Sequence, residues 1–280
     1  MSNWCTNRPC WATLTLLVLA PLILQIVVPG CSRGTRRKMS LRSASTNYKL
    51  ALPDDLSTSN PNERLDAVIR IAESGYVDSD NAYAVLDAVA RTDPQQQIRC
   101  IAVRAFTRYD DARPFSTLLT VMRATQESEN ALPPGNDLRW DCVAVMVELM
   151  DEGLLPEGLR DDVRDVFIDA LQRDASRNVK IAAAEGLGHI QDSQVFRPLI
   201  NALRLKDFAI ADRAERALIQ LTGVTHHYDA DAWEQWLANT AQPFAHAGET
   251  PADATVSKKP GFWSERKRGF KKAIGLGGEE

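Results

Sequence analysis

Four histidines have the widest chemical repertoire in this chain, and their spacing decides whether they can share a metal ion or a proton. They are His189, His226, His227 and His246. A zinc site needs two ligands in a frame such as His-x-x-x-His or Cys-x-x-Cys, and none of the four stands in one. The adjacent His226 and His227 point apart in most backbone conformations. The sequence therefore predicts no metal and no cofactor.

Paired carboxylates are the next candidates, because two neighbouring acids can act as general acid and general base. Examples are Asp110-Asp111, Asp151-Glu152 and Asp161-Asp162. Each pair falls where a helix is predicted to begin or end, and helix ends commonly carry solvated acids. No glycine-rich phosphate loop or nucleophile elbow accompanies them. We therefore expect a protein that is not an enzyme.

The surroundings of Cys31 predict a covalent modification. A polar stretch precedes an uncharged run from Trp11 to Val28, which is typical of a targeting segment. The run ends in Val28-Pro29-Gly30-Cys31, which resembles the lipobox of bacterial lipoproteins. The resemblance implies that residues 1–30 are a signal peptide and that Cys31 is acylated, for example with palmitate. The mature protein would then be lipid-anchored to a membrane of the bacterial cell envelope.

The charges after the apolar run leave a second topology open. Five basic residues follow it, namely Arg33, Arg36, Arg37, Lys38 and Arg42. Basic residues resist translocation, so they favour the cytoplasmic side. As a helix the 18-residue run would be about 27 Å long, the lower limit for crossing a bilayer. The alternative is an uncleaved inner-membrane anchor that holds a cytoplasmic adaptor.

Hydrophobic periodicity divides the rest of the chain into a helical middle and polar flanks. Residues 31–59 are rich in Ser, Thr and Asn, so we expect a flexible basic and polar tether. Between residues 60 and 240 apolar side chains recur at helical spacing, which predicts an all-α domain. Asn60-Pro61 and Asp93-Pro94 each offer an N-cap followed by proline at the first helical position.

The helical segments repeat. Each has a small residue three positions after its start and a larger apolar residue seven positions after it. The segments are Arg64–Ile71, Arg99–Phe106, Arg139–Met146, Lys180–Leu187 and Ala211–Leu218, and their ends are 35, 40, 41 and 31 residues apart. Second helices are expected between them at Asn81–Arg91, Pro114–Arg123, Asp161–Arg173, Gln194–Leu205 and Asp231–Asn239. Because one helix pair cannot bury its apolar face alone, about five pairs are predicted to stack into an α-solenoid.

The fourth repeat carries a family resemblance. Asn178-Val-Lys-Ile-Ala-Ala-Ala-Glu-Gly-Leu-Gly-His-Ile, followed by Asp192 and by Phe196-Arg-Pro-Leu-Ile-Asn-Ala-Leu, resembles a short bacterial HEAT repeat. The segment Leu221–Leu237 is similar to the closing segment of many bacterial HEAT-repeat proteins. The resemblance implies that the alanines pack against the next repeat and that the Gly-Leu-Gly stretch permits close helix approach.

The same resemblance implies a function. A HEAT-like solenoid at this location would be a protein-binding scaffold, with a partner protein held on a concave face formed by the second helices. An alternative is a lyase-type enzyme subunit, since similar short repeats belong to bilin chromophore lyases. Localisation and the absence of a catalytic pattern favour the scaffold.

The charge distribution bears on the partner. Residues 51–250 hold 33 acidic and 19 basic residues, whereas residues 31–50 carry +6 and residues 251–280 carry +3. The acidic middle argues against nucleic acid, because phosphate backbones select positive surfaces. One basic residue recurs near the start of each of the first four repeats and is expected to pair with acids of a neighbouring repeat. These residues are Arg64, Arg99, Arg139 and Lys180.

Three features of the solenoid are explained by packing. Trp233 and Trp236 share one helical face and are expected to cap the last repeat. Cys100 and Cys142 lie in helical patterns among apolar neighbours, so buried free thiols are expected. The insertion Thr125–Asp137 lengthens one connection, either as a tolerated surface loop or as a contact on one rim of the stack.

The C-terminal end is predicted to form a second contact region. Residues 241–257 are interpreted as a linker and residues 258–280 as a basic amphipathic tail. On a helix the aromatic side chains would lie on one side and most basic ones on the other, which suits an anionic membrane or an acidic partner. An inert solvated tail is the alternative. The contact residues would be Phe262, Trp263, Arg266, Lys267, Arg268, Phe270, Lys271 and Lys272.

Overall fold

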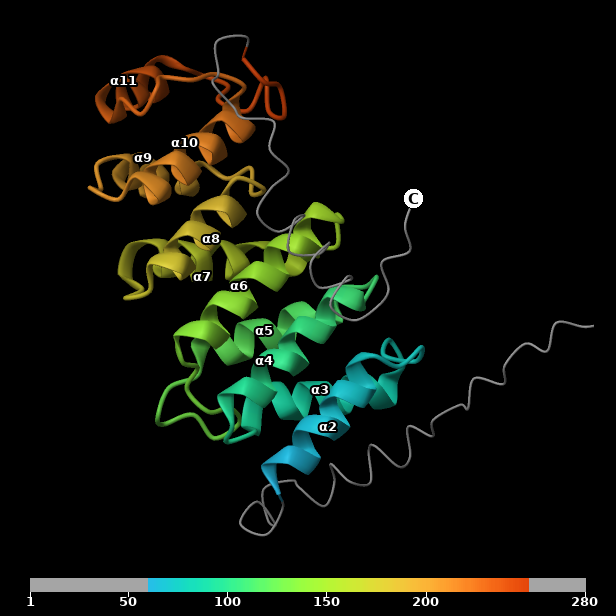
Figure 1. Cartoon of the computed structure of the whole chain (residues 1–280). Coiled ribbons are helices and arrows are strands. Elements are labelled where there is room, and N and C mark those ends of the chain that lie inside the picture. The colour runs from blue at the N-terminus through green and yellow to red at the C-terminus, as the bar shows by residue number, and fades with distance from the viewer. Residues whose placement is uncertain (1–59, 252–280) are drawn as a thin grey trace, which may run out of the picture. The chain divides into compact units, whose positions relative to one another are not determined.

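The computed structural model describes residues 60–251, and within this range the chain forms ten α-helices and no strand (Figure 1). The first helices of the five pairs are α2 (Pro61–Ala72), α4 (Gln96–Ala105), α6 (Asn136–Asp151), α8 (Arg177–Leu187) and α10 (Phe208–Thr222). The second helices are α3 (Asp80–Thr92), α5 (Arg113–Arg123), α7 (Arg160–Arg173), α9 (Phe196–Leu203) and α11 (Ala230–Asn239). Short 3₁₀ turns follow α4 at Phe106–Arg108 and precede α7 and α9 at Glu157–Leu159 and Ser193–Val195. The predicted all-α solenoid is confirmed.

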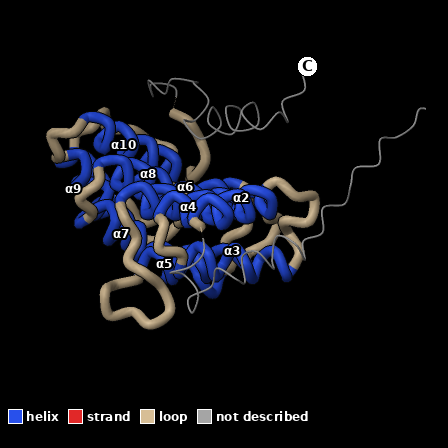
Figure 2. Tube along the Cα trace, turned by 60° about the horizontal axis from the view of Figure 1, so that its bottom comes forward, coloured by secondary structure: helices blue, strands red, loops and turns tan. Residues whose placement is uncertain are grey.

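The helices form two layers. Figure 2 shows α2, α4, α6, α8 and α10 side by side in one layer, with α3, α5, α7 and α9 in the other. Each first helix packs against the next first helix, and each second helix against the next second helix. The second helices α3, α5, α7 and α9 also pack against the first helix of the following pair. The buried apolar core therefore runs through the stack from pair to pair.

Local capping explains where several helices begin. The Asn60 side chain accepts a hydrogen bond from the Asn62 amide at 3.0 Å, with Pro61 at the first helical position, as the sequence predicts. Asp93 takes a different place from the predicted N-cap, because α4 begins only at Gln96. Asp93 instead ends α3, and its carboxylate accepts from the Gln95 amide at 2.8 Å.

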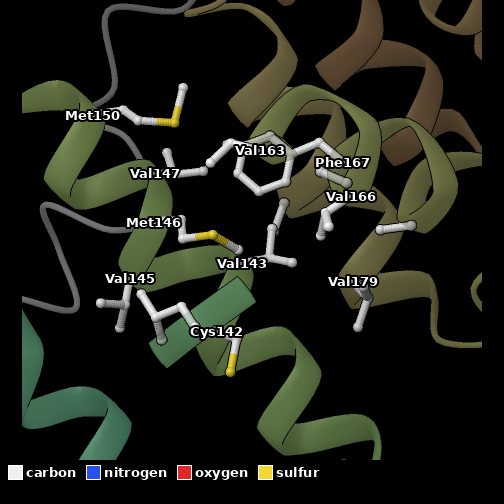
Figure 3. Close-up of a cluster of buried hydrophobic side chains, with 14 of the residues drawn as sticks. Cys142, Val143, Val145, Met146, Val147, Met150, Val163, Val166, Phe167 and Val179 are labelled. Carbon is white, nitrogen blue, oxygen red and sulfur yellow. The ribbon is translucent and has the colours of Figure 1, made fainter. Parts of the chain in front are cut away.

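Small residues on α8 allow its neighbours to approach closely. Ala183 is fully buried. A Cβ atom on Gly186 would lie 2.2 Å from the Phe167 ring of α7, and one on Gly188 would lie 3.0 Å from Ala217 Cα of α10. Both glycines are therefore needed for packing. Figure 3 shows the adjoining core, where valine and methionine side chains of α6 lie against Val163 and Phe167 of α7.

The C-terminal end of the stack is closed by two segments. Trp233 of α11 is fully buried and meets the Trp236 ring edge-on at 5.6 Å, which agrees with the predicted cap. The chain then folds back. Phe244 stacks on Phe196 with ring centroids 5.2 Å apart, and the Gly248 amide donates to the Gln220 carbonyl of α10 at 2.8 Å. The first part of the segment interpreted as a linker thus lies against α9 and α10.

Cys100 and Cys142 are buried free thiols. Burial raises the pKa of the Cys100 thiol to about 12, with the nearby Asp141 adding to the effect, and burial also raises the pKa of Cys142 well above its ordinary value. A thiol that stays protonated is a poor nucleophile. Both cysteines therefore act as core residues.

Candidate functional site

The site residues predicted from the sequence lie outside the described part of the chain. They are Cys31 and the tail residues Phe262, Trp263, Arg266, Lys267, Arg268, Phe270, Lys271 and Lys272. Among residues 60–251 no group of three potential metal ligands occurs. None of the helices in that range is long and apolar enough to cross a membrane.

A hollow of about 600 Å³ lies between the second helices α5 and α7, at the end of α5 where the insertion begins. Its floor is apolar and is formed by Met122, Ala124, Val166 and Ala170. Its rim is charged and includes Arg123, Arg139, Asp165, Asp169, Arg173 and Asp174. The hollow is open to solvent and belongs to the side of the stack formed by second helices.

The charged rim of the hollow is organised in pairs. Arg139 meets Asp174 at 2.6 Å, and the Asp174 carboxylate is nearly buried. Burial alone would raise the pKa of Asp174, but hydrogen bonds from the Arg139 guanidinium and the Ser176 amide outweigh it, so the pKa lies below the ordinary 3.8. Arg173 and Asp169 pair at 2.6 Å with both side chains exposed. The rim therefore has one fixed pair and one pair that solvent can loosen.

The fixed pair belongs to a pattern that recurs at the ends of repeats. Arg64 pairs with Asp93 at 2.9 Å, both side chains being buried, and Arg177 pairs with Asp207. In each case the aspartate follows the second helix of the arginine's own pair and accepts from a backbone amide that leads into the next helix. The expectation of acids in a neighbouring repeat is thus wrong for Arg64 and Arg139, because the acid lies at the end of the same repeat.

In the second repeat the insertion Thr125–Asp137 follows the second helix, and its backbone takes the place that the aspartate has in the other repeats. Arg99 is 3 % exposed and donates to the carbonyl oxygens of Ala90 at 2.7 Å, Leu132 at 2.8 Å and Pro133 at 3.2 Å. Its burial lowers the pKa of the guanidinium. Lys180 likewise contacts a carbonyl, that of Gln172, at 3.2 Å. The end of the insertion is therefore held on the stack by backbone oxygens, and no acid is needed.

A further surface lies at the last repeat, where sequence reasoning placed only a cap. Buried Glu215 accepts from the Thr225 hydroxyl, the Tyr228 amide and the Trp233 indole at 2.6, 3.3 and 2.8 Å. These bonds hold the loop in which Tyr228 has a positive φ of 68°. Tyr228 and Phe208 form an exposed ring pair with centroids 5.7 Å apart. Phe208 and Tyr228 are far apart in the sequence, so helical periodicity could not predict that their rings pair.

Comparisons with known proteins find similarity among solved structures. No family model and no curated protein matches the chain. Among solved structures, it is similar to a chain in a crystal structure of computationally designed armadillo repeat proteins for modular peptide recognition. The identity is 12%, the TM-score is 0.41, and the match covers 71% of this chain and 89% of that chain. The assignment of the solenoid therefore rests on the helices of residues 60–251.

Proposed function

We propose that this protein is a non-catalytic scaffold that holds a protein partner on the second-helix side of a HEAT-like solenoid. The observation that carries the proposal is the hollow between α5 and α7. Its volume of about 600 Å³ lies within the roughly 300–1,000 Å³ of sites that hold small ligands, so it can take one or two side chains of a partner. The neighbouring second helices extend the same side beyond it.

The chemistry of the hollow favours a peptide segment with an apolar side chain between polar ones. Met122, Val166 and Ala170 offer an apolar floor, and burying apolar area there contributes about 25 cal/mol per Å². An exposed ion pair contributes only about 0–1 kcal/mol, so Arg173 and Asp169 can exchange their bond for bonds to a partner. The rim would then select partners by charge position, while the floor supplies affinity.

The proposed location is a membrane of the bacterial cell envelope, reached through acylated Cys31. The sequence pattern at Val28–Cys31 supports this anchor, and the basic aromatic tail would add a contact to anionic lipid or to an acidic partner. In the alternative topology the same solenoid would be an adaptor on the cytoplasmic side. Protease accessibility of the solenoid in intact and permeabilised cells distinguishes the two, because only an outward-facing solenoid is cut when the inner membrane is intact.

The binding side is tested by photocrosslinking in cells. A photoreactive amino acid replaces Ala175, an exposed residue that lines the hollow. The matched control replaces Gln97, an exposed residue of the first helix α4. We expect one discrete adduct from position 175 and none from position 97, with the partner identified by mass spectrometry. Equal labelling from both positions, or none from position 175, would contradict the proposed site.

A further inference from the structure

The last of the first helices, α10, has one side that no further first helix covers within the described residues. Ala217 of α10 faces α8. Phe208, Asp212 and Glu215 lie on the opposite side of the helix, because they follow one another by four and three residues and 3.6 residues make one turn. The loop of residues 223–229 folds back over part of that side and is held there by hydrogen bonds to Glu215.

A small pocket, here named the α10 pocket, remains between α10 and this loop. It is lined by Asp212, Glu215, Arg216, Thr225 and Tyr228, among others. Its volume is about 20 Å³, and a cavity needs only about 10–15 Å³ to hold a water molecule. Two carboxylates and one guanidinium belong to the lining, so negative charge is in excess. The pocket therefore has room for one water-sized group and favours a positive one.

Glu215 is a buried carboxylate whose charge is not balanced by a cation. The other two buried carboxylates of the described residues each have one, since Asp93 pairs with Arg64 at 2.9 Å and Asp141 with Arg104 at 2.8 Å. Glu215 is 3 % exposed and, within the described part of the chain, accepts only from a hydroxyl, an amide and an indole, which are all neutral. Buried charges in proteins are normally paired. A cation in the α10 pocket would supply the pair.

Tyr228 connects the α10 pocket to an exposed aromatic surface. Its hydroxyl donates to Asp212 at 3.1 Å, and its ring lies beside that of Phe208 with the centroids 5.7 Å apart. Phe208 is 69 % exposed, more than any other large apolar side chain of the described residues. Ring faces attract cations, and they also pack against the methylene groups of a long charged side chain. A side chain with an apolar stem and a cationic end therefore fits both the rings and the pocket.

Lysine matches these features better than other cations do. Arg216 already pairs with Asp212 at 3.0 Å, so the cation for Glu215 has to come from another molecule. A lysine ammonium is a compact charge with three donors, whereas a guanidinium is a planar fork that needs more room than one water molecule. A metal ion needs several ligands, and residues 60–251 contain no group of three that could hold one.

We propose that the α10 pocket binds the ammonium group of a lysine that a protein partner presents, with the pocket carboxylates balancing its charge and the rings of Phe208 and Tyr228 packing on its stem. A protein segment is the source, because the exposed ring pair extends beyond the pocket and can contact residues next to the lysine. The acidic excess of residues 51–250 draws a cationic segment toward the solenoid. The inference goes beyond the scaffold function at the α5–α7 hollow, because this site lies on the first helix α10.

The test is an NMR titration of the full chain, held in a neutral detergent and labelled with ¹⁵N-tryptophan. The probe is the capped tripeptide acetyl-Ala-Lys-Ala-amide. Its matched control carries norleucine in place of lysine, which keeps the unbranched apolar stem and lacks the ammonium group. The readout is the indole N–H signal of Trp233, because this group donates to Glu215 at 2.8 Å.

The lysine peptide should shift the Trp233 signal in a saturable way, with a Kd at least about tenfold lower than that of the norleucine peptide. A peptide with arginine in place of lysine should bind at least about threefold more weakly than the lysine peptide, because the guanidinium is too wide for the pocket. Absence of a shift, or equal Kd values for lysine and norleucine, would overturn the proposal. Arginine binding as tight as that of lysine would contradict the assignment of an ammonium site.

Two variants locate the peptide on the protein. Phe208→Ala removes the exposed ring and should raise the Kd of the lysine peptide by about three- to fivefold. Its matched control is Tyr76→Ala, an exposed aromatic residue of the first repeat, which should change the Kd by less than about twofold. Asp212→Asn keeps the acceptor oxygen but removes the charge, so it should raise the Kd by about fivefold, whereas Asp110→Asn at an exposed position should not. Variants of the pocket that behave like their controls would contradict the site.

Arg216→Gln tests the electrostatics in the opposite direction. It removes the cation from the lining, so the remaining carboxylates should bind the lysine peptide about threefold more tightly. A merely structural role of Arg216 would leave the Kd unchanged or raise it, and either result in a variant that circular dichroism shows to be folded would contradict the charge balance proposed here. If the variant does not fold, Phe208→Ala and its control decide, because that side chain is largely exposed. None of these results affects the photocrosslink at position 175, which tests the hollow.

Discussion

Individual small residues set the spacing of the stack around α8. Gly186 lies so close to the Phe167 ring that there is no room for a Cβ atom between them. Ala183, three residues earlier on the same helix, is fully buried. In a two-layer solenoid a misplaced atom at such a position affects the contacts between two repeats, because each repeat is stabilised by its neighbours. Stability should therefore be most sensitive at these positions, although their side chains are the smallest in the chain.

Gly186→Ala should destabilise the fold by about 1–3 kcal/mol through overpacking against Phe167, which exceeds the up to about 1 kcal/mol that alanine gains in helix propensity. The matched control is Gly158→Ala, where no atom lies within 4 Å of the added Cβ atom. Urea denaturation of both variants measures the difference. A Gly186→Ala variant as stable as the control would refute the close approach.

Ala183→Asp should cost about 3–5 kcal/mol, because it buries a carboxylate without a partner. Asp192→Ala should cost about 1 kcal/mol. Asp192 accepts from the Gln194 amide at 2.8 Å and pairs with Arg164, which retains Asp161 and Asp165 as partners. Thermal melts that find the two substitutions equally mild would show that Ala183 does not lie at a tight interface.

At the scale of the elements, the ends of the repeats are fixed by buried polar contacts that the core alone does not supply. Asp93 and Asp174 each end one helix, orient the start of the next and neutralise an arginine. In the second repeat no such aspartate is present, and Arg99 donates hydrogen bonds to the carbonyl oxygens of Leu132 and Pro133 instead. The insertion is thus part of the framework at its C-terminal end.

The Asp174 contacts predict a pH dependence. Because its pKa is lowered in the folded state, the carboxylate stabilises the fold above its ordinary pKa of 3.8, and this contribution is lost as the pH falls through the folded-state value. Asp174→Asn should therefore lower stability by about 1.5–3 kcal/mol near neutral pH, and the difference from the wild type should shrink below about pH 4. Denaturation at several pH values measures it.

The control for this prediction is Asp169→Asn, which removes a carboxylate whose pair with Arg173 is exposed. It should cost less than about 1 kcal/mol at every pH. If Asp174→Asn were equally mild at neutral pH, or if its effect grew in acid, the carboxylate would not have the role assigned to it.

The elements were more predictable from sequence than the contacts between them. Helix bounds follow from local periodicity, so the predicted Pro114–Arg123 differs from α5 by one residue. The partner of Arg64 depends on which loop the fold brings near it, and local spacing carries no such information. The hollow needs α5, α6, α7 and the start of the insertion together, so no single motif indicates it. Phe244 was missed because its stacking partner, Phe196, lies 48 residues earlier.

At the scale of the whole molecule, the solenoid and the segments on either side of it in the sequence carry opposite net charges, which suggests different roles for them. The acidic solenoid lies between two basic segments, of which the first follows the predicted lipidation site and the second is the aromatic tail. A basic segment next to the lipidated cysteine would strengthen attachment to anionic lipid by about 1 kcal/mol per basic residue near the surface. The anchor and the tail would thus hold the solenoid near a membrane while its second-helix side stays available.

The anchor has a direct test. Metabolic labelling with a radioactive or clickable fatty acid should mark the wild type and leave Cys31→Ser unlabelled. Cys100→Ser is the matched control, because that thiol is buried in the solenoid and is no lipidation site. Equal labelling of wild type and Cys31→Ser, or a mature protein that retains Met1, would refute acylation at Cys31.

The central claim is that the α5–α7 hollow holds a partner. The most direct test measures how tightly the partner identified by crosslinking binds a variant in which a large side chain blocks the hollow. Ala175→Trp places a large ring in the hollow, and Asn178→Trp places the same ring at an exposed position of α8 outside its lining. Titration calorimetry with the purified partner should show that Ala175→Trp raises the Kd by at least about tenfold, or about 1.4 kcal/mol, while Asn178→Trp changes it by less than about twofold. Equal affinities for both variants and the wild type would contradict the claim.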